Sequence, residues 1–211
     1  MRVALFGATG FIGSAVLDEL LAQGHEVTAL VRTQGTVPAK PALSVIEGSV
    51  ADKGAVAQVV SGSAAVVSCL GTRRSDKQPV DFLASATRAI IEQMKIAHVE
   101  RLIAISGAGI RVPGERKPFP HNAISALVGL VAADLVAAKQ LEFDVLQENT
   151  EIAWTAVRPT RVVEGSATSG ARSGVEIAGM GMRVTRGDLA RFIVAQITDD
   201  TYVRRSPFVS S

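Results

Sequence analysis

The sequence predicts a single α/β domain, a doubly wound parallel sheet in a three-layer α/β/α arrangement. One observation is the glycine-rich stretch Gly7–Gly13, which separates a short apolar run from an amphipathic one. A second is the repeated alternation of apolar runs with helical patterns, which is typical of βα units around a parallel sheet. The third is the length of 211 residues, which suits one domain with a substantial core and is short for two.

The composition favours a globular protein and argues against several classes. Hydrophobic residues make up 47% of the chain and charged residues 20%, as in a packed domain, and the net charge of +2 is too small for a nucleic-acid-binding surface. Cys69, the one cysteine, lies in an apolar run, so we expect a small core residue in a reducing, cytoplasmic environment. The histidines, His25, His98 and His121, are too scattered in sequence to suggest a metal site.

Neither a leader peptide nor a membrane span is expected. The first strand-like run begins within two residues of Met1, which leaves no room for a signal sequence. The apolar stretch Ala123–Ala138 contains Asp134 and falls short of the ~20 residues that a spanning helix needs. We expect this stretch to be a buried helix or one that faces another subunit.

The glycine-rich stretch is the strongest functional signal. It follows the apolar run Arg2–Phe6 and opens the helical run Phe11–Gln23, which Gly24 ends. Glycine permits a tight turn and close approach of a ligand, and the following helix offers free N–H groups to an anion. We expect a dinucleotide pyrophosphate here, and the alternative is an ordinary turn whose glycines serve packing. The residues expected to bind are Gly7, Ala8, Thr9, Gly10, Phe11, Ile12 and Gly13.

The rest of the amino-terminal half alternates in the same way. Short apolar runs predict strands, and apolar positions that recur every three or four residues predict helices. Asp52 is a plausible N-cap for the second helix, and Gly62 lies at its end. The predicted strands are Glu26–Val31, Leu43–Glu47, Ala64–Leu70 and Arg101–Ile105, and the predicted helices are 52–62 and Val80–Ala97.

The carboxyl-terminal half has weaker patterns. Arg111–His121 is polar and proline-rich and is expected to be a surface loop that covers a site. Glu164–Gly174 is rich in glycine, serine and alanine and is expected to be mobile. The predicted elements are a helix over Asn122–Asn149 that is interrupted near Gly129, strands at Ala153–Val157 and Val175–Ile177, a helix over Leu189–Ile197, and an edge strand after Tyr202.

The end of the second strand indicates the type of nicotinamide cofactor. An acidic residue about 20 positions after the glycines is typical of NAD binding, whereas an arginine suits the 2′-phosphate of NADP. Arg32 and Thr33 stand at that place, and no acidic residue lies between Val27 and Glu47. We therefore predict NADP(H) rather than NAD(H). The alternative for Arg32 is an ordinary solvated side chain.

Two further strand ends are expected in the site, because ligands bind at the carboxyl ends of strands in a doubly wound sheet. Leu70, Gly71, Thr72 and Arg73 follow one strand and are expected beside the cofactor. Ser106 follows the next strand, where catalytic or positioning groups belong. Arg73 and its neighbour Arg74 are equally consistent with a solvated pair, and a serine that merely caps a turn is the alternative for Ser106.

Together these motifs resemble the atypical short-chain dehydrogenase/reductase group. The resemblance covers nearly the whole chain and includes the branch of flavin and biliverdin-IXβ reductases and of nitrogen-repression-type cofactor sensors. It implies a Rossmann-type fold, a nicotinamide cofactor and an acceptor-side portion at about 159–211. The motifs that carry it are the Gly-x-x-Gly-x-x-Gly turn, Val31-Arg32, Gly71-Thr72, Ser106, the Trp154–Pro159 run and the Val184–Ala190 run.

The resemblance also implies roles for particular residues. Ser49 and Val50 fall beside the adenine, although relatives have an aspartate where Ser49 stands. Pro159 and Thr160 flank the nicotinamide, and Ser106 lies beside it as the candidate catalytic residue. The places of two substrate-side histidines in the biliverdin-IXβ reductase pattern read Arg161 and about Phe143, which weakens a specific tetrapyrrole assignment.

The acid/base pair of typical members is missing from the sequence. These enzymes use Tyr-x-x-x-Lys, in which the lysine lowers the pKa of the tyrosine. The one tyrosine is Tyr202, followed four residues later by Ser206; Lys139 has Leu135 four residues before it. Two functions fit: an NADPH-dependent reductase of a flat acceptor such as a flavin, quinone or tetrapyrrole, or a non-catalytic NADP(H) redox sensor. The expected partner is a small-molecule acceptor, and the expected state is a monomer or weak homo-oligomer.

Overall fold

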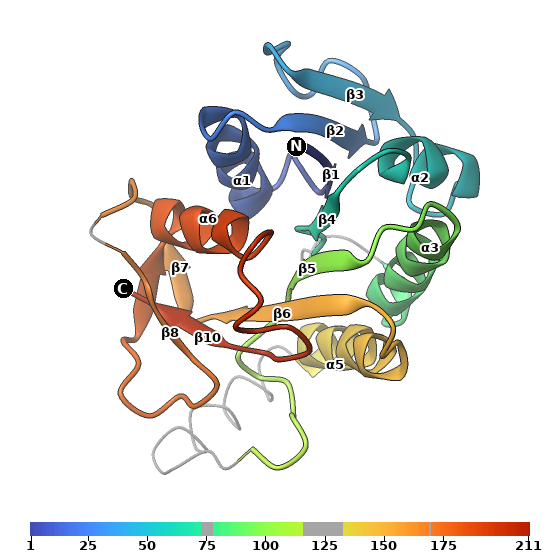
Figure 1. The fold of residues 1–211 in the computed structure, drawn as a ribbon. Helices are drawn as coiled ribbons and strands as arrows, with labels where there is room; N and C mark the ends of the chain where they lie inside the picture. Colours follow the sequence, from blue (N-terminus) through green and yellow to red (C-terminus); the bar gives the residue numbers. More distant parts are fainter. Residues whose placement is uncertain (73–77, 116–132, 169) are drawn as a thin grey trace.

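The structure is a computed structural model, and it describes residues 1–72, 78–115, 133–168 and 170–211. In these residues the chain forms an eight-stranded sheet in the order β3-β2-β1-β4-β5-β6-β10-β8, with helices on both faces (Figure 1). The strands from β3 to β6 are parallel. The predicted doubly wound α/β fold is confirmed.

The amino-terminal half has nearly the predicted elements. β4 is shorter than predicted, because the chain leaves the sheet after the Cys69 N–H has donated to the Phe6 carbonyl. The Asp52 carboxylate caps α2 by accepting from the N–H groups of Gly54 and Ala55, as the sequence suggested. The strands are β1 (Arg2–Phe6), β2 (Glu26–Val31), β3 (Leu43–Glu47), β4 (Ala65–Ser68) and β5 (Arg101–Ile105), and the helices are α1 (Phe11–Ala22), α2 (Lys53–Val60) and α3 (Phe82–Ile96).

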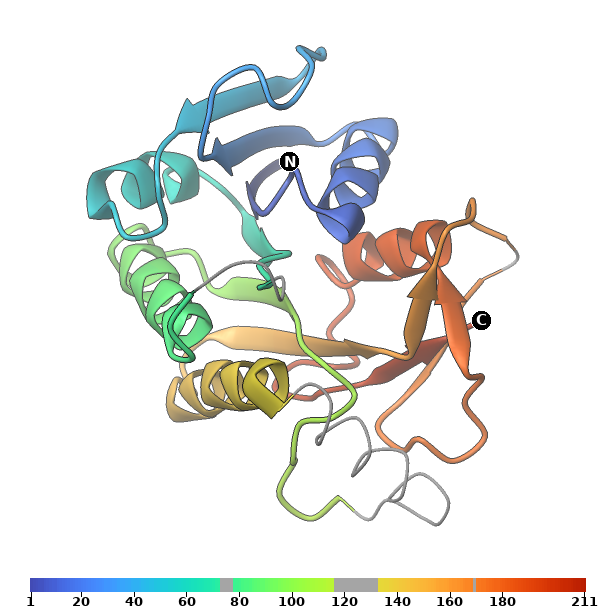
Figure 2. The same ribbon diagram turned by 180° about the vertical axis from the view of Figure 1, so that it is seen from behind.

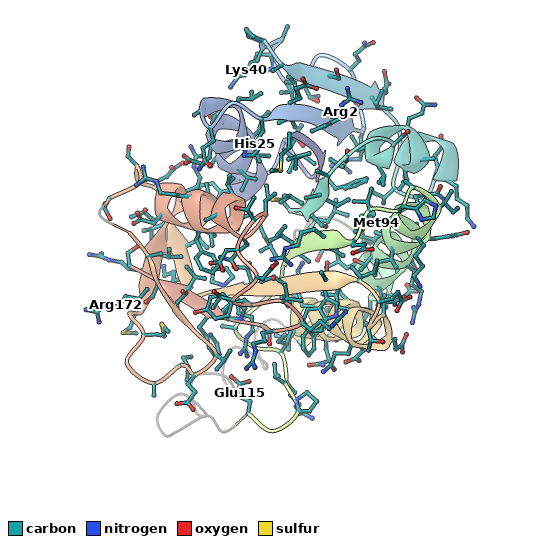
Figure 3. All side chains as sticks on the ribbon, in the orientation of Figure 1. Arg2, His25, Lys40, Met94, Glu115 and Arg172 are labelled. Atoms are coloured by element: carbon teal, nitrogen blue, oxygen red, sulfur yellow. The ribbon has the colours of Figure 1, made fainter. Side chains whose placement is uncertain are left out.

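The helices form two layers over the sheet. α1 and α6 (Arg186–Ala195) lie together on one face, and α2, α3 and α5 (Ala133–Glu148) lie on the other (Figures 1 and 2). Each face of the sheet buries its own apolar cluster, because successive residues of a strand point to opposite faces. Met94 of α3 belongs to the second of these layers and is fully buried against the sheet (Figure 3). None of the helices in the described residues is long and apolar enough to cross a membrane.

α5 and β6 (Ala153–Pro159) follow β5 in the chain. The part of the predicted helix before Ala133, including Gly129, lies outside the described residues. β6 runs two residues beyond the predicted end, because the N–H of Arg158 donates to the Pro207 carbonyl of the neighbouring segment. The strand therefore continues to Pro159, and the chain turns at Thr160.

The carboxyl-terminal part differs most from the prediction. The strand predicted at Val175–Ile177 is wrong: β8 (Arg172–Gly174) precedes it and pairs antiparallel with β10 (Phe208–Ser210). The tail strand is also not at the edge, because β10 lies between β6 and β8. At the outer edge, Arg172 of β8 points away from the sheet (Figure 3).

Two further features of this part were not predicted. β7 (Arg161–Val163) and β9 (Arg183–Thr185) form a separate two-stranded parallel sheet. α6 begins at Arg186, three residues before the predicted start, because the Thr185 hydroxyl caps it by accepting from the Asp188 N–H. Strands of three residues leave little periodicity in the sequence, which is why this region could not be divided correctly in advance.

Candidate cofactor site

The order of the sheet strands reverses between β1 and β4, and the glycine turn lies at this point. Gly7 follows β1 with φ +83°, and a Cβ on it would lie 2.7 Å from the Cys69 carbonyl oxygen after β4. The two strand ends therefore meet so closely that only glycine fits. A crevice at such a reversal is where doubly wound sheets bind ligands.

Gly13 presses α1 against the same turn. A Cβ on Gly13 would lie 2.0 Å from the Gly7 carbonyl oxygen, so the helix starts directly on the turn backbone. The Gly10 N–H donates to the Gly7 carbonyl over 3.0 Å and closes the turn. Among the described residues, no side chain caps the first turn of α1, and no acidic residue stands there. The exposed N–H groups fit the pyrophosphate that the sequence predicts.

The other predicted residues of the turn differ in exposure. Thr9 and Phe11 are exposed, and Ile12 is half-buried. The Ala8 side chain is buried in the core, so only its backbone is available to a ligand. The glycine stretch thus offers mainly backbone groups at its surface, as expected for phosphate binding.

The adenine end of the predicted site is formed by the ends of β2 and β3. The Gly48 N–H donates to the Val31 carbonyl over 2.9 Å, so the segments that carry Arg32 and Ser49 lie side by side. Arg32 is exposed, and no described residue forms a hydrogen bond or ion pair with it. The guanidinium is therefore available for an anion from solution.

The neighbours of these two residues have structural contacts. The Thr33 carbonyl accepts from the Thr36 hydroxyl over 2.7 Å. The Ser49 hydroxyl accepts from the Ala51 N–H over 3.2 Å, and Val50 packs against the core. Ser49 thus forms a local turn where relatives were expected to have an aspartate beside the adenine.

Lys139 joins the ends of β4 and β5. Its Nζ donates to the Leu70 carbonyl over 2.9 Å, to the Ile105 carbonyl over 2.6 Å and to Glu142 Oε2 over 2.8 Å. Both charged side chains are buried, and burial raises the pKa of Glu142 even though Lys139 opposes this effect. The three ammonium protons are all engaged, so Lys139 fixes the two strand ends. Gly71 and Thr72 follow Leu70, and Arg73 lies outside the described residues.

Ser106 lies at the end of β5, as predicted. Its N–H donates to the Val157 carbonyl over 2.8 Å, which links the ends of β5 and β6. Its side chain is buried, with 6% of the residue exposed, and no described residue is within hydrogen-bonding distance of Oγ. A buried hydroxyl without a partner is uncommon and fits a group that meets a ligand.

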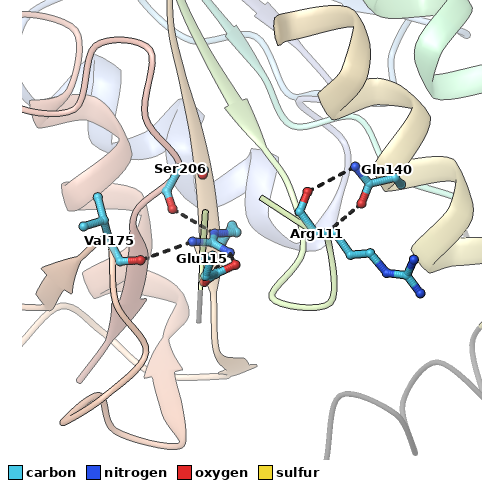
Figure 4. Close-up of polar contacts among 6 residues, drawn as sticks. Arg111, Glu115, Gln140, Val175 and Ser206 are labelled. Atoms are coloured by element: carbon cyan, nitrogen blue, oxygen red, sulfur yellow. Dashed lines mark hydrogen bonds and ion pairs between the residues drawn. The ribbon is translucent and has the colours of Figure 1, made fainter. Parts of the chain in front are cut away.

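The segment after Ser106 is held at two points (Figure 4). The Gln140 side chain accepts from the Arg111 N–H over 2.7 Å and donates to the Arg111 carbonyl over 3.2 Å. The Glu115 carboxylate accepts two bonds from Arg158, over 3.0 and 2.9 Å. The described part of the predicted loop, Arg111–Glu115, is therefore a surface segment bonded to α5 and to β6.

Arg158 lies at the centre of the contacts around this segment. Only 1% of it is exposed, its Nε donates to the Ser206 carbonyl over 2.8 Å, and its guanidinium lies 3.7 Å from the centroid of the Phe208 ring. Burial lowers the pKa of Arg158, and Glu115 opposes that shift. One buried cation thus ties together the loop after β5, the end of β6 and the start of β10.

The remaining predicted residues lie at the end of β6. Thr160 donates its N–H and its hydroxyl to the Val209 carbonyl, over 3.0 and 3.2 Å, so β10 fixes the turn after Pro159. Arg161 is exposed in β7. Phe143 is buried and meets Trp154 edge to face at a centroid distance of 5.8 Å. Phe143 therefore faces the core from α5.

Sequence reasoning missed three groups at this edge: Arg158 with Glu115, the strand-joining role of Lys139, and Arg186 beside the glycine turn. Arg186 lies over the Phe11 ring, 5.2 Å from its centroid. Of these, only Lys139 could have been found from the sequence, because it matches the lysine of the Tyr-x-x-x-Lys motif. Cys69 is half-buried and packs against the core, and burial raises its pKa to about 12.

Comparisons with known proteins agree with this geometry. Residues 7–200 match the model of a family described as NAD(P)H-binding. The uncharacterized protein YwnB of Bacillus subtilis is 28% identical over 168 residues, which cover 75% of this chain and 71% of YwnB. Two other curated relatives match over shorter stretches, and the chain spans 34% and 19% of their lengths.

Solved structures show the same fold. A short-chain dehydrogenase/reductase from Veillonella parvula, solved in complex with NADP, superposes with a TM-score of 0.80 at 21% identity and covers 100% of this chain and 94% of its own. ChuY from Escherichia coli O157:H7, described as an anaerobillin reductase, has a TM-score of 0.78 at 21% identity and covers 100% and 97%. The family match confirms the predicted nicotinamide cofactor and the predicted resemblance.

Proposed function

Because this chain belongs to the NAD(P)H-binding family, we propose that it is a reductase that uses NADPH to reduce a flat, conjugated acceptor. The acceptor class is a flavin, a quinone or a tetrapyrrole. The observation that carries the proposal is the buried, unpartnered hydroxyl of Ser106 at the end of β5. The described residues of 107–115 and of 159–211, apart from the start of α6, form the acceptor side of the site, and Ser106 orients the nicotinamide or the acceptor by hydrogen bonding.

The preference for a ring acceptor follows from the groups at hand. NADPH supplies a hydride, and a conjugated acceptor takes its proton from water, so the protein needs only to hold the two rings in contact. Leu135 stands four residues before Lys139 with 42% of its surface exposed, and Lys139 is engaged with Leu70 and Ile105. The Tyr202 hydroxyl is 3.0 Å from the Ser173 hydroxyl, in a separate contact. This set of residues supports a mechanism without a phenolic acid.

A turnover assay tests the reductase function. Purified protein is mixed with NADPH and with FMN, dichlorophenolindophenol or biliverdin, and the loss of NADPH absorbance is followed. We expect turnover with at least one acceptor, and Ser106→Ala should lower kcat with NADPH affinity largely kept. Ser63→Ala is the control, because Ser63 is also buried but lies before β4, at the opposite end of the sheet, and its hydroxyl donates to the Val59 carbonyl. Tight NADPH binding without turnover of any acceptor would favour the redox sensor instead.

The choice of NADPH over NADH rests on Arg32. A charge-assisted bond is worth about 1.5–3 kcal/mol, or roughly tenfold to a hundredfold in affinity. Arg32→Ala should therefore weaken NADPH binding by that factor and leave NADH binding unchanged. Arg172→Ala removes the same charge from an exposed place at the outer edge of the sheet and should change neither affinity. An Arg32→Ala variant that still prefers NADPH would exclude Arg32 as the phosphate ligand.

A further inference from the structure

Arg186 is a cation near the glycine turn, and the cofactor site described so far, which consists of the turn and Arg32, gives it no role. It is the first residue of α6, and its guanidinium lies 5.2 Å from the centroid of the Phe11 ring. Phe11 is the first residue of α1, directly after the glycine turn, with 46% of it exposed. Phe11 thus holds the Arg186 guanidinium beside the glycine turn.

The stability of α6 does not explain this arginine. The N-terminus of a helix is the positive end of its dipole, so a cation there is unfavourable. α6 already has the two groups that favour its start, the Thr185 cap and the acidic Asp188 in the first turn. A cation at this place is therefore favourable only with an anion beside it, and among the described residues that anion is Glu164.

The protein partner of Arg186 is weakly held. Among the described residues, the ion pair of Arg186 is with Glu164, at 3.5 Å, and 70% of the Glu164 side chain is exposed. Exposed pairs of this kind add little stability, because water screens both charges. A ligand anion can displace Glu164 at small cost.

We infer that Arg186 binds the pyrophosphate of the cofactor from the side of α6, opposite the N–H groups of α1. The inference rests on the proposed NADPH site and adds a second cation to it. The first turn of α1 has neither a side-chain cap nor an acidic residue. A pyrophosphate carries two negative charges, which one helix N-terminus only partly offsets, and the planar guanidinium fork matches phosphate oxygens. The Phe11 ring keeps the fork in position by a cation–π contact.

Nucleotide titrations separate this role from that of Arg32. Arg186→Gln should raise the Kd for NADPH and for NADH by the same factor, about tenfold, because both contain the pyrophosphate. The same variant should bind adenosine 2′-monophosphate, which lacks the pyrophosphate, as the wild type does. Arg32→Ala should instead weaken the binding of NADPH and of adenosine 2′-monophosphate and leave NADH binding unchanged. The matched control is Arg191→Gln, which removes a charge one turn further along α6, where Arg191 lies 3.9 Å from Glu19; it should bind all three probes normally.

The outcomes are distinct. Wild-type Kd values for NADPH and NADH in Arg186→Gln, or an equal loss in Arg191→Gln, would overturn the inference and leave the proposed function intact. A wild-type protein that binds neither nucleotide would overturn both. If Arg186→Gln fails to fold by its thermal transition, two variants replace it. Arg186→Lys should bind NADPH several-fold more weakly, because lysine lacks the fork, and Glu164→Gln should bind it more tightly. Unchanged affinity in both variants would also overturn the inference.

Discussion

The glycine turn of the cofactor side and the Arg158–Glu115 pair of the proposed acceptor side are held together by different forces. At the glycine turn, backbone meets backbone: a Cβ on Gly7 or Gly13 would collide with a carbonyl oxygen. At the Arg158–Glu115 pair, two buried charges join segments that are distant in sequence. The glycine turn is therefore intolerant of added volume, and the pair is intolerant of losing one partner.

This difference agrees with the ligand that we propose for each side. A pyrophosphate is recognised by N–H groups that point outward, and glycines leave them uncovered. The flat acceptor that we propose would need walls, and the segments around Arg158 are loops and three-residue strands with few backbone bonds between them. Hydrogen-bonded side chains replace the missing ladder, at the cost of burying their charges.

The largest expected effect comes from breaking the charge pair of the acceptor side. Arg158→Met leaves the Glu115 carboxylate buried and unpaired, which should lower the free energy of unfolding by about 3–5 kcal/mol in urea titrations. Arg158→Met/Glu115→Leu should recover much of this loss. Arg88→Met is the control, because its ion pair with Glu148 is exposed, and it should cost about 0–1 kcal/mol. If the double variant loses as much as the sum of the single ones, the pair is not coupled.

A methyl group added at Gly13 tests whether close backbone contact stabilises the cofactor side. Gly13→Ala brings a Cβ to 2.0 Å from the Gly7 carbonyl oxygen, so the backbone must move. We expect a loss of about 1–3 kcal/mol in unfolding free energy together with a marked loss of NADPH affinity. Gly71→Ala is the control for stability, because a Cβ there meets nothing within 4 Å. Equal stability of the two variants would show that close approach does not hold this side together.

The two sides also differ in how far the sequence predicted them. β1, β2, β3 and β5 have the predicted bounds, since each is a local apolar run ended by turn residues. The glycine turn could be recognised because its glycines lie three residues apart in the sequence and contact one another in the fold. Arg158 and Glu115 lie 43 residues apart, so no local pattern marks them. β10 pairs with β6 and β8, which lie far from it in sequence. A run of three residues gives no indication of which strands it will pair with.

Asp188, in the first turn of α6, gives the segments that it joins a pH dependence that the glycine turn lacks. Its carboxylate accepts from the Thr168 N–H over 2.7 Å and from the hydroxyls of Thr168, Thr185 and Ser211. Burial acts to raise the pKa of Asp188, but these hydrogen bonds outweigh it and hold the pKa below its usual value.

Because the pKa of Asp188 is lower in the folded state, its stabilisation is complete above the unfolded pKa near 4 and is lost as the pH falls through the folded value. Asp188→Asn should cost about 1.5 kcal/mol at pH 7, and its loss of stability on acidification should be shallower than that of the wild type. Urea titrations between pH 2 and pH 7 measure both effects. Parallel curves for the two proteins would contradict this assignment.

The smallest expected effect comes from a contact between a side chain and the backbone. The Gln140 side chain forms two hydrogen bonds with the N–H and the carbonyl of Arg111, as a neighbouring strand would. Gln140→Ala should cost only about 0.5–1.5 kcal/mol, because the segment is exposed there and water can replace the amide. The same change should clearly lower kcat although it lowers the free energy of unfolding only slightly, because Arg111 begins the segment Arg111–Glu115 that follows Ser106. Gln147→Ala, an exposed change on the same helix, is the control. A lower kcat with an unchanged NADPH Kd would assign this segment to the acceptor, and a raised NADPH Kd would assign it to the cofactor side.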